Sequence, residues 1–269
     1  MRAFRIAYDG RPFHGFQRQP DVATVEDAIF DALRDLDVFD GEKPDGYAAA
    51  GRTDAGVSAL AQTVAFEAPE WCSPAALNSE LPAVVRAWAS ADVPSDFHAT
   101  VDARERTYTY HLYAPGTAAE STVDDERVRE AMTRLSGDHD FHNLTSDVDN
   151  TVRDLETDVE RDGDFLVLTF RAGGFCRQLV RRLVTLVESV AARRDDFDRI
   201  ERVLSEEPLD GPDGVGPAPP YPLVLTDVAY DCEFVVDEAA ATSARNVFSE
   251  RHETAVNAAR VAGAIRDGL

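Results

Sequence analysis

The chain has 269 residues, of which 44% are apolar, enough to bury one large core or two smaller ones. It carries 50 acidic against 27 basic residues, a formal net charge of −23, and Lys43 is its single lysine. The ordinary apolar content excludes a disordered chain, and the acidic balance argues against a generic basic nucleic-acid binder or a protein of anionic membranes. No apolar run approaches the ~20 residues of a membrane span and no signal peptide precedes the first predicted strand, so a cytoplasmic location is expected.

The acidic excess has two explanations. Carboxylates spread along the whole chain, with almost no lysine, are typical of a surface adapted to a very salty cytoplasm, where the Debye length at ~1 M salt is only ~3 Å. A cationic partner is the alternative. The three cysteines, Cys72, Cys176 and Cys232, are far apart and odd in number, so neither a disulfide framework nor a CxxC metal site is indicated.

Strand-like and helix-like stretches alternate along the chain in two comparable batches. In the first batch, the patterns predict strands over 3–8, 47–50, 60–67 and 83–90 and helices over 24–36 and 74–80. In the second, they predict strands over 106–113, 151–160, 164–171 and 223–231 and helices over 124–136, 175–192 and 196–205, with 207–222 irregular. Uneven crossovers and hairpins favour an α/β fold of the α+β type, with a mixed, mostly antiparallel sheet covered by helices. We expect an N-terminal half over 1–100, a C-terminal half over 101–235 and an Ala-rich helical tail over 236–269.

An arginine, a threonine and an aspartate stand between two glycines at 51–56, directly after an apolar strand. Glycines at such positions allow positive φ and the close approach of another chain or a ligand. A tight turn in which Asp54 caps the following backbone is one interpretation. The other is that Asp54 acts as a nucleophile or general base, since a fixed cation, either Arg52 or an arginine from elsewhere, can keep a lone carboxylate ionised.

Two stretches of the chain are basic, although the chain as a whole is strongly acidic. Residues 171–194 hold six arginines against Glu188 alone, a local balance of +5, and residues 1–20 hold four against Asp9, a balance of +3. On the predicted 175–192 helix, Arg177 and Arg181 are four residues apart and would share one face. Arginines that pair with surface carboxylates are the plain interpretation, and phosphate contacts on an otherwise repelling protein are the alternative.

Aromatic side chains could supply stacking surfaces. Tyr108 and Tyr110 lie two apart on a predicted strand and so face the same side, and Phe175 sits beside glycines where a base could reach it. Core packing is the plainer interpretation of all three. His139 and His142 lack a third ligand at metal-binding spacing and are expected to be structural.

Seven ordered motifs resemble those of the tRNA pseudouridine synthase A family. GRTDAGV at 51–57 resembles the catalytic motif, and it is accompanied by YDGRPFHGFQRQP at 8–20, ALNSELP at 76–82, FHATVDARERTYTYHLY at 97–113, GDHDFHNLT at 137–145, FRAGGFCRQLVRRLV at 170–184 and APPYPLVLTDVAY at 218–230. The resemblance implies the pseudouridine synthase fold and an isomerase that converts uridine to pseudouridine in tRNA with neither a cofactor nor a metal.

The resemblance also implies roles for individual residues. Asp54 matches the essential aspartate that attacks the target uridine, Arg52 the arginine that extrudes the base, and Tyr108 the tyrosine that stacks on it. Arg181 matches the basic residue that pairs with the aspartate, and Leu223 matches a position that lines the base pocket. Base extrusion is the step that exposes a stacked nucleotide to an enzyme.

Thr53, Phe175 and Arg177 are expected to bind substrate beside these residues. The family also implies a homodimer and, as partner, a tRNA modified in its anticodon stem-loop, at positions 38–40. Two departures from the family pattern are Ser58, where histidine is frequent, and Pro222, where glycine is usual before the pocket leucine. A non-catalytic RNA-binding module of the same fold is the alternative function. A carboxylate-dependent hydrolase would need a second acid or a metal, and no such partner stands out.

Overall fold

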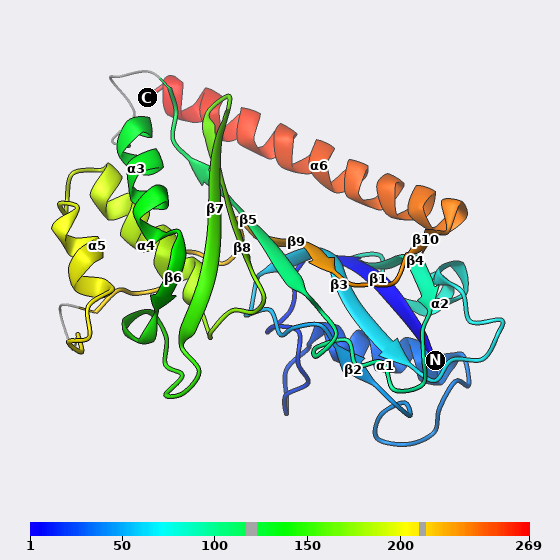
Figure 1. The fold of residues 1–269 in the computed structure, drawn as a ribbon. Helices are drawn as coiled ribbons and strands as arrows, with labels where there is room; N and C mark the ends of the chain where they lie inside the picture. Colours follow the sequence, from blue (N-terminus) through cyan, green and yellow to red (C-terminus); the bar gives the residue numbers. More distant parts are fainter. Residues whose placement is uncertain (117–122, 210–213) are drawn as a thin grey trace.

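The computed structural model describes residues 1–116, 123–209 and 214–269. Within them, one ten-stranded sheet runs through the molecule in the order β10-β4-β1-β3-β9-β5-β8-β7-β6, with β2 paired to β3 (Figure 1). The strands are β1 (Arg2–Tyr8), β2 (Ala48–Ala49), β3 (Ser58–Phe66), β4 (Val85–Asp92), β5 (Glu105–Tyr113), β6 (Gly137–Asp140), β7 (Val152–Asp162), β8 (Phe165–Ala172), β9 (Leu223–Ala229) and β10 (Val235–Val236). Among the described pairs, β3 and β9 run parallel and the others antiparallel. The predicted mixed, mostly antiparallel sheet is therefore confirmed.

The described helices other than α6 lie towards the two ends of this sheet. They are α1 (Val25–Asp35), α2 (Pro74–Glu80), α3 (Asp125–Leu135), α4 (Leu179–Ala191), α5 (Asp198–Val203) and α6 (Glu238–Asp267), with a 3-10 turn η1 (His142–Leu144). In Figure 1, α3, α4 and α5 lie together beside β6 and β7, whereas α1 and α2 lie at the end that holds the N-terminus. The long α6 runs along the molecule from β10 towards α3.

Two large apolar clusters fill the space between helices and sheet. The first joins β5 and β8 to α3 and α4, with Leu168, Leu183 and Val187 fully buried. The second joins β1 and β3 to α1 and α2, where the rings of Phe4 and Phe66 stack with centroids 5.1 Å apart. Each fully buried side chain of this size contributes ~1.5–3 kcal/mol through loss of contact with water. Tyr108 packs against both clusters, so its ring lies where the two meet.

One predicted helix begins later than expected. The pattern predicts a helix from residue 175, but α4 begins at Leu179, because Gln178 has a φ of +60° and interrupts the helical backbone there. Arg177 precedes the helix, and its backbone N–H donates to Asp147 Oδ2 at 2.8 Å. The prediction that Arg177 and Arg181 share one helix face is therefore wrong.

The tail forms one continuous helix. Asp237 caps it, since its Oδ1 accepts from the N–H of Ala240 at 3.0 Å. Its first turns bury Ala240, Ala241 and Ala244, and it contacts β4 and α2. Of the helices in the described ranges, none is both long enough and apolar enough to cross a bilayer.

Candidate active site

A cavity of about 1240 Å³ opens where the two apolar clusters meet. It is lined by the loop between β2 and β3, by the loop before β5, by the segment between β8 and α4, and by the start of β9. All eight candidate residues named from the sequence line it: Arg52, Thr53, Asp54, Tyr108, Phe175, Arg177, Arg181 and Leu223. The fold thus brings together residues that are up to 171 positions apart, from Arg52 to Leu223.

The residues between β2 and β3, here called the 50–57 loop, are fixed by hydrogen bonds on both sides. Gln62 donates from Nε2 to the carbonyl oxygen of Gly51 at 2.8 Å. The hydroxyls of Tyr8 and Thr53 lie 2.8 Å apart, and the N–H of Phe16 donates to the Thr53 carbonyl at 3.0 Å. The loop therefore presents the next residue, Asp54, from a backbone that has little freedom to move.

Asp54 forms an ion pair with the first turn of α4. Arg181 donates from Nη1 to Asp54 Oδ2 at 2.9 Å and from Nε to the carbonyl oxygen of Ala218 at 2.7 Å. The Arg181 side chain is 12% exposed and that of Asp54 is 30% exposed, so the arginine is enclosed while the carboxylate still faces the cavity. Charge-assisted hydrogen bonds of this kind are about twice as strong as neutral ones and hold a carboxylate in a set direction.

Aromatic and aliphatic side chains form the apolar wall of the cavity. The rings of Tyr108 and Phe175 meet edge to face with centroids 5.1 Å apart. Burial raises the pKa of Tyr108 to about 12, an effect that the Arg106 charge opposes and the Asp54 charge reinforces. Leu223, the first residue of β9, is buried and pairs with Tyr110 of β5. The wall thus offers flat surfaces and a phenol that stays neutral at ordinary pH.

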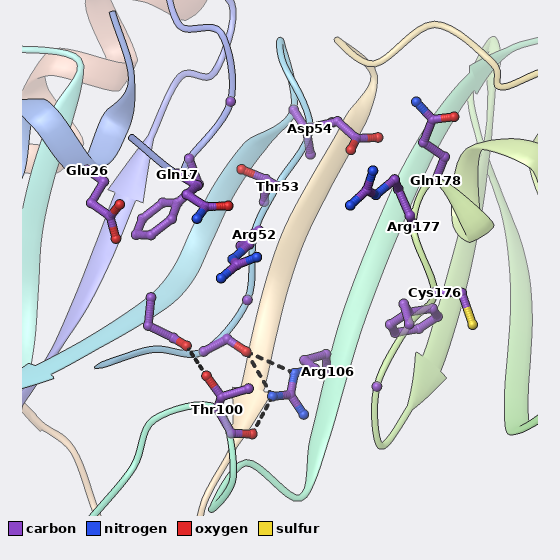
Figure 2. Close-up of a pocket in the computed structure, with 18 of the residues that line it drawn as sticks. Gln17, Glu26, Arg52, Thr53, Asp54, Thr100, Arg106, Cys176, Arg177 and Gln178 are labelled. Carbon is purple, nitrogen blue, oxygen red and sulfur yellow. Dashed lines mark hydrogen bonds between the residues drawn. The ribbon is translucent and has the colours of Figure 1, made fainter. Parts of the chain in front are cut away.

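Arg106 is a buried cation that the sequence did not reveal. Within the described ranges, its side chain donates only to backbone carbonyls, namely those of Ala50 at 2.8 Å, Thr100 at 2.7 Å, Ala103 at 3.4 Å and Gly173. Figure 2 shows it below the 50–57 loop, with dashed lines to two of these oxygens. Arg106 therefore joins the 50–57 loop to the segment between β8 and α4. An arginine two positions before Tyr108 is the only signal in the sequence, and it does not say which carbonyls converge on it.

The basic side chains that line the cavity differ in whether they form hydrogen bonds or ion pairs with other residues. Arg52 is exposed and makes no hydrogen bond or ion pair with the described residues. Arg177 lies 4.0 Å from Asp147 and is exposed, and Figure 2 places it with Gln178 across the cavity from Arg52. Lys43, the single lysine, lines the cavity as well, although the sequence alone gave no reason to select it. These cations are available to a polyanion.

The N-terminal arginines do not form the phosphate-binding patch that their local charge suggested. Arg5 is buried and donates to the carbonyl of Val228 at 2.6 Å, so it cannot reach a ligand. Arg2 and Arg11 pair with Asp92 and Asp9. Of the four, Arg18 alone lines the cavity. Arg2, Arg5 and Arg11 are therefore engaged within the protein, and Arg2 pairs with an exposed carboxylate as the plain interpretation expects.

Potential metal ligands do not gather in the described part of the chain. No group of three or more His, Cys, Asp or Glu side chains lies at ligand distances there. His139 donates from Nε2 to the carbonyl oxygen of Ser136 at 3.0 Å, and His142 Nδ1 lies 3.4 Å from Asp140 Oδ1. His139 belongs to β6, which lies beyond β8 and β7 from the cavity-lining strand β5, and His142 belongs to η1.

Comparison with known proteins shows to which family the chain belongs. A model described as tRNA pseudouridine synthase matches residues 131–231. A protein named tRNA pseudouridine synthase A from Haloarcula marismortui is 61% identical over 275 residues, covering 100% of both chains. The chain belongs to the tRNA pseudouridine synthase A family. Members of this family are isomerases that convert uridine to pseudouridine in tRNA.

A second member, tRNA pseudouridine synthase A from Halobacterium salinarum, is 59% identical over 263 residues and covers 97% of both chains. These two relatives come from halophilic archaea. Among solved structures, the archaeal box H/ACA sRNP Nop10-Cbf5 complex aligns with a TM-score of 0.37 and 12% identity, over 71% of this chain and 43% of that one.

Proposed function

We propose that this tRNA pseudouridine synthase acts on uridines of the anticodon stem-loop through an essential Asp54. The observation that carries the proposal is the Asp54–Arg181 ion pair, which stands in the one cavity that all eight candidate residues line. A turn-capping role does not need such a partner. The pair instead leaves a fixed carboxylate 30% exposed to the cavity, as a nucleophile or a base requires.

The reaction breaks the N1–C1′ bond of uridine, turns the uracil, and joins C5 to C1′. The proton on C5 is lost and N1 gains one, so atoms balance within one nucleotide and nothing is oxidised or hydrolysed. Asp54 can add to the ribose or the ring, or take a proton from C2′ to give a glycal. None of these routes needs a cofactor, since the carboxylate supplies the only reacting group.

Extrusion of the base is assigned to the side chains around Asp54. Arg52 is exposed and free of partners in the described structure, so it can enter the stack as the uridine leaves. Tyr108 and Phe175 present an edge-to-face aromatic pair on which the base can stack, worth ~1–3 kcal/mol. Leu223 closes the apolar side, and Thr53 holds the loop through Tyr8.

Contacts with the RNA backbone are assigned to the cations at the cavity. Arg177, Arg18 and Lys43 are exposed and line the cavity, and Arg18 is also paired with Asp27 of the first helix. Each can approach a phosphate of a stem-loop whose target base lies at Asp54.

We further propose that the chain works as a homodimer in the cytoplasm. Sedimentation of the purified protein in molar salt would test the oligomeric state.

The decisive experiment compares wild type with Asp54→Ala and Asp54→Asn on tRNA transcripts, mapping pseudouridine chemically. We expect loss of product in both variants with tRNA binding kept within a few-fold. Product formation by Asp54→Ala at the wild-type rate would overturn the assignment and favour a non-catalytic role for the loop. Pseudouridine outside the anticodon stem-loop would reject the proposed target while leaving the role of Asp54 intact.

A further inference from the structure

The C-terminal helix α6 takes no part in the chemistry described above and does not line the cavity, yet one of its side chains contacts the residue that follows β1. From His252 to Leu269 every residue except Gly263 is exposed. Just before this exposed part, Arg251 turns back to the body of the protein and forms an ion pair with Asp9 at the end of β1. The Asp9 side chain is 6% exposed, whereas that of Arg251 is 35% exposed.

Asp9 is held by two arginines. Arg11 donates from Nη2 to Asp9 Oδ2 at 2.6 Å and from Nε to Oδ1 at 2.9 Å, and Arg251 binds the same Oδ2. Burial alone would raise the pKa of Asp9, but hydrogen bonds from Arg11 and Arg251 outweigh it and lower the pKa to about 2. Asp9 is therefore a buried anion whose position depends on both cations.

Residues 9–16, here called the 9–16 segment, lie directly against the 50–57 loop. A Cβ added to Gly10 would stand 2.0 Å from the carbonyl oxygen of Val57, so only glycine permits this approach. The N–H of Gly10 donates to Ser58 Oγ at 3.0 Å. One end of the 9–16 segment is thus packed against the backbone three residues after Asp54.

The other end of the 9–16 segment is bonded to the residues on either side of Asp54. The N–H of Phe16 donates to the carbonyl of Thr53 at 3.0 Å. The N–H of Gly56 donates to the carbonyl of Phe13 at 3.3 Å. A continuous series of contacts therefore runs from Arg251 through Asp9 and the 9–16 segment to the backbone that carries Asp54.

We propose that Arg251 is a positioning residue, through which the C-terminal helix fixes the 9–16 segment and so the attacking geometry of Asp54. This inference rests on the proposed role of Asp54. Its physical basis is that reacting atoms must be held in a near-attack arrangement, and a displacement of ~1 Å can lower a rate by ~10²-fold. An ion pair with a buried carboxylate is also screened less by salt than an exposed one.

The test compares Arg251→Gln and Arg251→Lys with the matched control Arg260→Gln. Arg260 lies on the same helix, is exposed, and has no hydrogen bond or ion pair with the described residues. Single-turnover pseudouridine formation and the tRNA Kd are measured in molar salt, with circular dichroism to establish that each variant is folded. We expect Arg251→Gln to lower the rate by about tenfold with an unchanged Kd, Arg251→Lys to restore most of it, and Arg260→Gln to match wild type.

A rate for folded Arg251→Gln within twofold of wild type would overturn the inference, as would a change confined to the Kd. In an Asp9→Asn background, Arg251→Gln should lower the rate no further, and an undiminished drop there would reject the route through Asp9. If Asp9→Asn does not fold, rescue by Arg251→Lys decides the same question. Failure of the proposed function is seen separately, as activity of Asp54→Ala.

Discussion

Arg181 binds Asp54 through a 2.9 Å hydrogen bond that spans 127 residues of sequence. Asp54 belongs to the 50–57 loop and Arg181 to the first turn of α4, so the pair joins the two batches of elements at the cavity. The guanidinium is held at its other side by the Ala218 carbonyl at 2.7 Å. Among the described residues, nothing donates to Asp54 Oδ1, which leaves this oxygen available to a substrate.

Replacement of Arg181 should affect turnover far more than stability. We expect Arg181→Ala to lower the single-turnover rate by ~10²–10³, since a preset charge at a reacting group is worth that much. The free energy of unfolding should fall by only about 1 kcal/mol, because the partner carboxylate keeps part of its contact with water. Arg182→Ala is the matched control: Arg182 binds the Val215 carbonyl and does not line the cavity, so its variant should keep the wild-type rate. Equal losses in the two variants would contradict the pairing role.

Tyr108 should act through its ring and not through its ionisation. Burial raises its pKa to about 12, so the neutral form is favoured by folding. This stabilising contribution is complete below the unfolded pKa of ~10 and is lost as pH rises through about 12. Tyr108→Phe should therefore keep most activity and the same pH profile from neutral pH to about 10, whereas Tyr108→Leu should lose the edge-to-face contact with Phe175 and about tenfold in rate. A pH profile altered by the phenylalanine would show that the hydroxyl takes part.

Local signals in the sequence predicted most elements well. The predicted helix over 74–80 is α2 to the residue, because Ser73 caps it and Pro74 occupies its first turn. The predicted hairpin is β7 and β8, and the predicted tail helix is α6. By contrast, β6 was missed, since its sequence GDHD has no strand pattern and it forms only by pairing with β7. The division into residues 1–100, 101–235 and a tail stays a prediction.

The candidate site shows the same contrast between local signals in the sequence and contacts that only the fold creates. Residues with a chemical signature, such as Asp54 in the stretch between two glycines, were selected as candidates from the sequence, and the resemblance paired Arg181 with Asp54. What could not be predicted are contacts between residues that are far apart in the sequence. Arg106 and Arg251 look like ordinary charges in the sequence, and only the fold brings them to carbonyls and to Asp9. The left-handed Gln178 was missed for a similar reason, since nothing local requires it.

Loss of Arg106 should weaken both the fold and the site. Its side chain is buried and joins the 50–57 loop to Gly173, so Arg106→Met leaves several carbonyl oxygens without a donor. Each buried unsatisfied group costs ~1–3 kcal/mol, and we expect a total destabilisation of ~2–4 kcal/mol, visible in denaturant unfolding. Arg106→Lys can donate to fewer of these oxygens, so the stability of this variant should lie between those of wild type and Arg106→Met. An Arg106→Met protein as stable as wild type would show that water replaces the donor.

The acidic surface leads to a prediction about salt. At a net charge of −23, repulsion between carboxylates should destabilise the protein in dilute buffer, where the Debye length at 0.1 M is ~10 Å. At ~1 M salt this length falls to ~3 Å, so the unfolding midpoint should rise between the two conditions. Potassium chloride is the salt to use, because sulfate would stabilise any protein through exclusion from its surface.

A charge-neutralised variant separates repulsion from general salt effects. Glu70, Glu206, Glu207 and Glu253 are exposed, and their side chains make no hydrogen bond or ion pair with the described residues. Replacing all four by glutamine removes charge without removing contacts, so the midpoint in dilute buffer should rise and its dependence on salt should become shallower. A wild-type midpoint that stays flat or falls between low and molar salt would contradict adaptation to a salty cytoplasm. The same slope in wild type and variant would assign the salt effect to something other than carboxylate repulsion.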